Sequence, residues 1–148
     1  MLKFSRKVDY GLILLSKLRD EPGGSSAREV AERYHLPQPM VANILKSLTT
    51  AGILASTRGA QGGYELARDP QAITLADLVQ ALEGPFSLVE CTSGETNCKF
   101  ISLCPTHDPL QVVHRKFEEF MSGLTIAQII GPPRSSAGFI QPTQQVCP

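Results

Sequence analysis

Three short helical patterns in close succession constrain the fold of this chain more than any other feature of its sequence. Apolar residues recur at helical spacing over residues 5–20, 26–34 and 38–51, and the gaps between these segments contain glycine or proline. A serine stands at the N-cap position of each of the first two segments, and Gly52 stands at the C′ position of the third. The pattern therefore predicts three consecutive helices, of which the second is short.

A glycine-rich hairpin follows the third helix. Two short extended pieces, residues 53–57 and 63–67, flank the tip Arg58-Gly59-Ala60-Gln61-Gly62. Helix, short helix, turn, helix and hairpin is the order of a winged helix-turn-helix, in which the last of the three helices enters the major groove of DNA. We therefore expect a mainly α fold, a winged helix-turn-helix with a small β-hairpin wing.

The second half of the chain predicts three more helices. Thr74 is placed to cap a helix that ends at Gly84. Asp108 followed by Pro109 indicates the start of a long helix with proline at its first position. Thr125 is placed to cap a last, short helix.

The long helix carries an apolar seam at heptad spacing, with steps of three and four residues. The seam residues are Leu110, Val113, Phe117, Phe120 and Leu124. Two interpretations stay open, one face of a core helix or a dimerisation helix, and we favour the second because a DNA-binding module of this size usually works as a pair. His114 falls between seam positions, so we expect it to be exposed.

These patterns divide the chain into four parts. We expect a winged helix-turn-helix domain over residues 1–84, a cysteine-rich loop over 85–107, and a dimerisation helix with a final short helix over 108–130. Residues 131–148 contain four prolines, two glycines, three glutamines and one charge, a composition typical of a disordered tail.

Charge is balanced overall but divided unevenly along the chain. Residues 1–68 hold ten Lys/Arg against six Asp/Glu, and residues 69–148 hold four against eight. A basic first half indicates contact with a polyanion there. The longest aliphatic run, residues 12–15, is too short for a membrane span or a secretory segment, so we expect a cytoplasmic protein.

The third helix and the wing carry the candidate DNA contacts. The predicted solvent-facing positions of the helix are Gln38, Met40, Ala42, Asn43, Lys46 and Ser47. Asparagine and glutamine can pair with adenine, lysine can bond guanine or phosphate, and an arginine at a wing can enter a narrow minor groove. The contacts that we predict are Gln38, Met40, Asn43 and Lys46 of the helix and Arg58 and Gln61 of the wing. The alternative is that these are ordinary exposed residues.

A cluster of thiols in a polar loop is the second candidate site. Six residues separate Cys91 from Cys98, five separate Cys98 from Cys104, and two separate Cys104 from His107. Thiolates with one imidazole suit either zinc or an iron–sulfur cluster, and only the last pair has the tight spacing of a structural zinc site. The spacing favours an iron–sulfur cluster slightly over zinc. Cys147 lies in the expected tail and is predicted to be a free thiol.

Five segments give the chain a resemblance to a known family. They are KFSRKVDYGL, STRGAQGGYELARDP, ITLADLVQALEG, the cysteine loop with CPTH, and LTIAQII. From about residue 2 to 130 the chain resembles the Rrf2 (Rrf-two) superfamily of winged-helix regulators, nearest its IscR-like iron–sulfur branch. The resemblance implies cluster ligands at Cys91, Cys98 and Cys104, with His107 as the fourth in a two-iron two-sulfur (2Fe-2S) cluster. It also implies that Arg58 lies in the minor groove.

Three positions depart from the pattern that the resemblance implies. The first cysteine gap is one residue longer than in IscR-like members, and Ala42 stands where those members carry a polar or acidic residue. Asp9 lies on the first helix, where nitric-oxide-sensing members use a carboxylate of the partner chain to complete a four-iron (4Fe-4S) cluster. We favour His107 over Asp9 as the fourth ligand because those members generally lack the histidine.

The function that the resemblance implies is a homodimeric bacterial transcription regulator, a repressor of iron–sulfur assembly genes, whose cluster sets its affinity for a palindromic promoter site. No catalytic constellation is visible in the sequence, so we expect neither enzymatic activity nor a small-molecule substrate, and no membrane partner. The alternatives are a nitric-oxide or redox sensor with a four-iron cluster, a zinc or thiol-switch regulator, and an electron carrier.

Overall fold

Hydroxyl caps begin most of the helices in the computed structural model, which describes residues 3–59, 62–92 and 98–133. The capped helices are α1 (Arg6–Asp20), α2 (Ala27–Tyr34), α4 (Leu75–Glu83) and α6 (Ile126–Ile130). In each, the preceding Ser or Thr accepts a hydrogen bond from an amide of the first turn, which satisfies a donor that the helix itself leaves free. All four caps stand where the sequence predicts them.

The helix-turn-helix and its wing are confirmed. α3 (Gln38–Thr50) follows Pro37, and Gly52 after it has a positive φ of 70°. β1 (Leu54–Ser56) pairs antiparallel with β2 (Tyr64–Leu66), so each strand is shorter than the extended piece predicted for it. A short 3-10 turn, η1 (Pro70–Ala72), leads from β2 to α4.

The loop after α1 adds a third strand-like segment to the wing, which the sequence did not predict. The amide of Tyr64 donates to the carbonyl of Ser25 at 2.9 Å, and the amide of Ser25 donates back to Tyr64 at 3.2 Å. A Cβ at Gly63 would lie 2.9 Å from the backbone of Ser25, so a glycine is required for this close approach. The loop 22–25 is therefore part of the support of the wing.

A single apolar core lies between α1, α3 and α4 and is closed by α2, β1 and α6. Its fully buried side chains include Leu14, Leu15, Val30, Ile44, Leu45, Leu48, Ile73, Leu78 and Ile126. α6 returns to this core because Leu75 and Ile126 donate backbone hydrogen bonds to Leu124 and Ile73, both at 2.8 Å. We call α1–α4, the wing and α6 the head.

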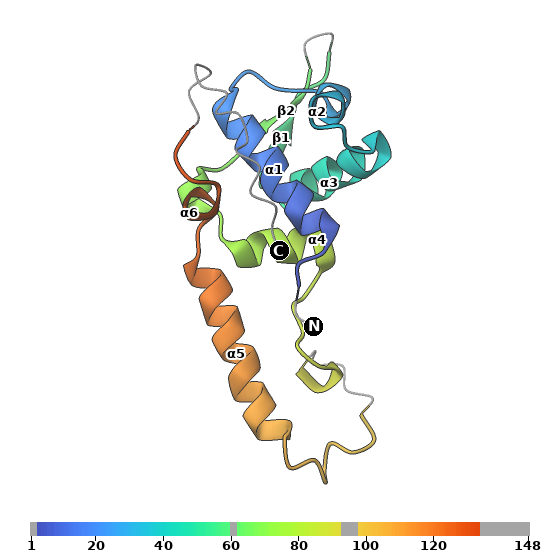
Figure 1. Ribbon diagram of the computed structural model, residues 1–148, viewed down its shortest axis with the longest axis vertical. Coiled ribbons are helices and arrows are strands. Elements are labelled where there is room, and N and C mark those ends of the chain that lie inside the picture. Colours follow the sequence, from blue (N-terminus) through green and yellow to red (C-terminus); the bar gives the residue numbers. More distant parts are fainter. Residues whose placement is uncertain (1–2, 60–61, 93–97, 134–148) are drawn as a thin grey trace, which may run out of the picture.

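The rest of the described chain projects from the head as an arm, which we define as residues 85–92 and 98–123. In Figure 1 the chain leaves α4, passes through η2 (Glu90–Thr92) to the end of the molecule opposite the wing tip, and returns along α5 (His107–Gly123). Only His114 and Met121 of α5 are buried. Most of the surface of this helix therefore faces solvent.

Two predictions for α5 are wrong. The helix begins at His107, one residue before Asp108, and Pro109 is its third residue. Proline fits there because first-turn amides have no acceptor within a helix. His114 is 8% exposed, because α5 packs on α4 and on Phe86 with the face that carries His114 and Met121.

The apolar seam of α5 points in large part away from the head. Val113 is 40% exposed and Phe120 is 62% exposed, and Val112 beside them is also exposed. Phe117 is half-buried and lies near Phe86, with ring centroids 6.3 Å apart. For Val113 and Phe120, the interpretation of the seam as one face of this chain's own core is therefore wrong.

Candidate nucleic-acid interface and cysteine segment

One face of α3 is buried and the opposite face is open to solvent. Gln38, Asn43 and Lys46 are exposed, as predicted for DNA contacts. Met40 differs from the prediction because it is half-buried against the core, one helical turn before the buried Ile44. The open face of α3 is therefore narrower than the sequence suggested.

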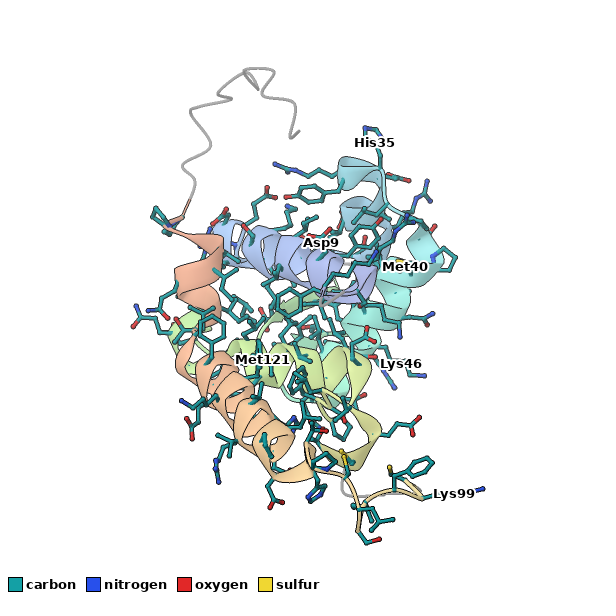
Figure 2. The ribbon with its side chains drawn as sticks, turned by 60° about the horizontal axis from the view of Figure 1, so that its bottom comes forward. Asp9, His35, Met40, Lys46, Lys99 and Met121 are labelled. Atoms are coloured by element: carbon teal, nitrogen blue, oxygen red, sulfur yellow. The ribbon has the colours of Figure 1, made fainter. Side chains whose placement is uncertain are left out.

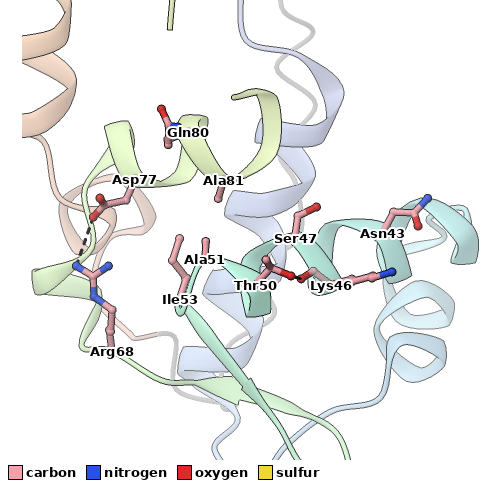
Figure 3. A pocket seen from close by; sticks show the side chains of 10 residues that line it. All are labelled: Asn43, Lys46, Ser47, Thr50, Ala51, Ile53, Arg68, Asp77, Gln80 and Ala81. Carbon is pink, nitrogen blue, oxygen red and sulfur yellow. Dashed lines mark hydrogen bonds and ion pairs between the residues drawn. The ribbon is translucent and has the colours of Figure 1, made fainter. Parts of the chain in front are cut away.

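A groove of about 680 Å³ lies between the open face of α3 and α4 (Figure 3). Asn43 and Lys46 line it from α3, and Gln80 lines it from α4. Arg68 and Asp77 form an ion pair of 3.4 Å at the other end of the groove. The groove leaves the polar side chains of α3 accessible to a partner.

The wing presents Arg58 on its exposed side. Beyond it the amide of Gly62 donates to the carbonyl of Gly59 at 2.9 Å, which closes the turn. A Cβ at Gly62 would lie 2.2 Å from the carbonyl oxygen of Thr57, so this glycine is needed by the hairpin itself. Gln61, the other predicted wing contact, lies outside the described residues.

The three cysteines of the arm are free thiols of intermediate exposure. Cys91 lies in η2, and Cys104 lies just before α5. Between Cys98 and Cys104 three large apolar side chains are exposed, Phe100 at 72%, Leu103 at 84% and Ile101 at 37%. The arm therefore presents thiols and apolar groups together at the end of the molecule opposite the wing. Cys147 lies outside the described residues.

Two hydrogen bonds at the start of α5 favour metal binding by Cys104 and His107. The hydroxyl of Thr106 lies 3.2 Å from the Cys104 sulfur, and this hydroxyl and the amide of Thr106 lower the pKa of the Cys104 thiol below its usual value. Nδ1 of His107 lies 2.9 Å from the carboxylate of Asp108. When Nδ1 donates to that carboxylate, Nε2 is left with the lone pair that binds metal.

The residue types of the arm fit an iron–sulfur cluster, since three thiols and one imidazole provide four donors of the kind that iron accepts. In the conformation described, these donors are not gathered. Among the residues that the structure describes, no group of three or more His, Cys, Asp or Glu side chains is close enough to hold a metal ion. A cluster would therefore require Cys91, Cys98, Cys104 and His107 to come closer together.

Asp9, the alternative fourth ligand, is exposed on α1. Figure 2 shows it on the head, well separated from Lys99 at the tip of the arm. Within one chain this carboxylate does not lie near the cysteines. Any ligation by Asp9 would thus involve the arm of a second copy.

Sequence reasoning missed two polar side chains of the arm, Thr106 beside Cys104 and Gln111 on α5. Nε2 of Gln111 donates to the carbonyl of Cys91 at 2.9 Å. Its position four residues after His107, on the same helix face, is the signal that could have identified it.

In the described ranges no helix is both long enough and apolar enough to cross a membrane.

The model of the Rrf2 family, described as an iron-dependent transcriptional regulator, matches residues 4–132. The chain belongs to the Rrf2 family. It is therefore a DNA-binding transcriptional regulator, and its head has the winged-helix fold of the family.

Two kinds of relative, CymR proteins and an IscR protein, are similar to this Rrf2 chain. The HTH-type transcriptional regulator CymR of Bacillus subtilis (strain 168) is 36% identical over 100 residues, which are 66% of this chain and 72% of that protein. The structure of CymR, the global cysteine regulator of B. subtilis, has a TM-score of 0.68 and 29% identity and covers 88% of this chain and 97% of its own.

The structure of T. potens IscR has a TM-score of 0.63 and 30% identity, and the match covers 87% of this chain and 86% of that one. Identity in the structural comparison is thus nearly equal for IscR and CymR. The similarity places the chain in the Rrf2 family but does not choose between the two kinds of relative.

Proposed function

We propose that this Rrf2 protein is a homodimeric regulator of the IscR-like branch, in which an iron–sulfur cluster sets the affinity for DNA. The ligands would be Cys91, Cys98, Cys104 and His107, with a 2Fe-2S cluster favoured over 4Fe-4S. One observation carries this proposal. His107, at the first turn of α5 and three residues after Cys104, has Nδ1 2.9 Å from the carboxylate of Asp108, which leaves Nε2 available to bind a metal.

When bound, such a cluster supplies a redox-active centre whose presence depends on iron and sulfide. The arm links that centre to the head through the chain itself, since the cysteine segment runs directly into α5 and α5 packs on α4. We infer that bringing the four donor residues together fixes the start of α5. The cluster can shift the equilibrium between the conformation with separated donor residues and the one with the donors together only if it binds these two conformations with different affinities.

The dimer is supported by the exposed apolar residues of α5. Val113 and Phe120 lie seven residues apart on one face, and a second copy of the same helix would bury both. In a dimer of winged heads, the spacing of the two α3 helices decides whether both half-sites of a palindrome are engaged together. The cluster would thus act on DNA through this spacing.

The head supplies the DNA contacts in this proposal. Gln38, Asn43 and Lys46 would meet base edges or phosphates in the major groove, and Arg58 would enter the minor groove. Contacts of Met40 and Gln61 with DNA stay predictions. We propose iron–sulfur assembly genes as the targets, repression as the outcome and the cytoplasm as the location.

A thiol-based regulator is the second candidate, and the similarity to CymR favours it. All three cysteines of the arm are partly exposed, and the lowered pKa of Cys104 increases the fraction of its reactive thiolate. Such a regulator would respond through sulfur chemistry without iron.

Purification without oxygen separates the two candidates. Iron and acid-labile sulfide are counted and visible spectra are recorded for the wild type, His107→Ala and Asp9→Ala. We expect a coloured wild-type protein with about two irons and two sulfides per chain, lost in His107→Ala and kept in Asp9→Ala. A colourless protein without iron, or one that holds zinc, would contradict the proposed function, and loss in Asp9→Ala alone would contradict the fourth ligand.

A further inference from the structure

The backbone around Cys91 is fixed by a compact hydrogen-bonded turn. The hydroxyls of Ser87 and Thr92 lie 2.7 and 2.8 Å from the carbonyl oxygen of Val89, and the amide of Thr92 donates to the same oxygen at 2.9 Å. Groups that converge on one acceptor restrict the conformations of the turn that carries Cys91. The first cysteine thus lies on an ordered part of the arm.

A hydrogen bond from α5 holds this turn in place. Nε2 of Gln111 donates to the carbonyl of Cys91 at 2.9 Å, across twenty positions of sequence, and the contact is partly buried. Gln111 lies one helical turn after His107 on the same face of α5. Cys91 and His107 are therefore drawn toward one side of the helix, although they belong to opposite ends of the cysteine segment.

We propose that Gln111 is a positioning residue for the cluster. It holds the main chain of Cys91 against the face of α5 that carries His107, so two of the four donor residues are kept together before iron arrives. The inference rests on the proposed function, and it assigns Gln111 no contact with the cluster itself. Groups that orient metal ligands in this way affect metal affinity by about 10- to 100-fold.

The chemistry of the contact explains why a glutamine suits this position. A backbone carbonyl only accepts hydrogen bonds, so its partner must donate. Leucine at position 111 keeps a similar volume but has no donor, and an ionised glutamate presents only acceptors to the carbonyl. Lysine restores an N–H donor of comparable reach. Arg115, exposed one turn later on α5, is the matched control position.

The test compares full-length wild type, Gln111→Leu, Gln111→Glu, Gln111→Lys and Arg115→Leu, each reconstituted with ferrous iron and sulfide without oxygen. The rate at which a chelator bleaches the cluster is measured by visible absorption, and helix content is measured by circular dichroism. We expect cluster loss about tenfold faster in Gln111→Leu and Gln111→Glu, with unchanged helix content. Gln111→Lys and Arg115→Leu are expected to match the wild type.

A second readout does not depend on a cluster. In the iron-free protein, we expect iodoacetamide to alkylate Cys91 faster in Gln111→Leu than in the wild type, with Cys104 unchanged. If wild type binds no iron, the proposed function fails while this readout still tests the anchor. Equal chelation rates in wild type, Gln111→Leu and Gln111→Glu would overturn the inference, as would equal alkylation of Cys91.

Discussion

The head and the arm of this molecule differ in how far their apolar side chains are buried. In the head, residues such as Leu14 and Leu45 are fully buried by other parts of the same chain. In the arm, Leu103 and Phe120 are mostly exposed. The apolar side chains of the head are thus buried largely within one chain, whereas the arm has exposed apolar surfaces of the kind that a second copy or a cofactor covers. The predictions below test this difference.

The largest effect is expected in the core of the head. Leu14→Ala removes a side chain with 0% exposure and leaves a cavity, so it should lower the free energy of unfolding by about 3 kcal/mol. Urea denaturation followed by circular dichroism measures this loss. Val113→Ala in the arm should cost less than about 1 kcal/mol at low protein concentration. Equal losses for the two variants would remove the distinction between head and arm.

The next effect concerns the exposed face of α5. Phe120→Asp places a charge in the proposed dimer interface and should weaken dimerisation by about 30-fold, because aromatic residues dominate such interfaces. Sedimentation velocity over a range of concentrations gives the dissociation constant. Arg115→Asp, on another face of the same helix, serves as the control. A wild type that is monomeric at all concentrations would show that the arm is not covered by a second copy.

All residues that contact DNA directly are expected to lie in the head. Arg58→Ala is expected to weaken DNA binding by about tenfold. If Lys46 contacts a phosphate, Lys46→Ala should make the plot of log binding constant against log salt concentration less steep by about one unit. Fluorescence anisotropy with a DNA fragment selected from a random pool measures both. Arg115→Ala in the arm should bind as the wild type does. A tenfold loss in Arg115→Ala would place part of the DNA surface on the arm.

The junction of arm and head contains a polar side chain that lacks a full set of partners. His114 stacks on Phe86 with ring centroids 5.4 Å apart, and its Nδ1 is buried with no hydrogen-bond partner among the described residues. Its Nε2 lies 3.4 Å from Glu118. His114→Phe removes the unsatisfied nitrogen, so stability should stay equal or rise by about 1 kcal/mol. A melting curve that shows a loss above about 2 kcal/mol would contradict this account.

The smallest effect is an electrostatic one on the surface of the head. Lys17 and Arg33 hold the pKa of Glu21 below its usual value of about 4.5. A lowered pKa in the folded state stabilises the head above that value, and the contribution is lost as the pH falls through the folded pKa. Glu21→Gln should therefore cost less than about 1 kcal/mol at pH 7 and nothing near pH 2. A loss that is the same at both values would exclude the ion pairs as its cause.

The same contrast explains what the sequence predicts well. In the head, α1, α2, α4 and α6 begin at predicted caps, and the hairpin forms where glycines and short apolar pieces indicate it. These signals are local and agree with the packing of one core. The third strand-like segment at Ser25 was missed because a glycine-rich loop gives no periodic signal for a partner thirty-nine positions away.

The arm was harder to predict because its residues contact elements that are distant in sequence. Heptad spacing found the exposed residues Val113 and Phe120 but gave the wrong environment for His114, which is buried by Phe86 of the preceding segment. The candidate ligands were found from residue type and spacing. The spacing of Gln111 from His107 indicates a shared face of α5, but the contact of Gln111 with Cys91 spans twenty positions and is not revealed by spacing.

The central claim is that the state of the arm sets the affinity of the head for DNA. The most direct test measures the dissociation constant for one selected DNA fragment with cluster-loaded wild type, chelator-treated wild type, and the variant with Cys91, Cys98 and Cys104 changed to serine. We expect the loaded protein to differ by at least about tenfold from the other two, which should agree with each other. Equal affinity in all three would contradict the claim.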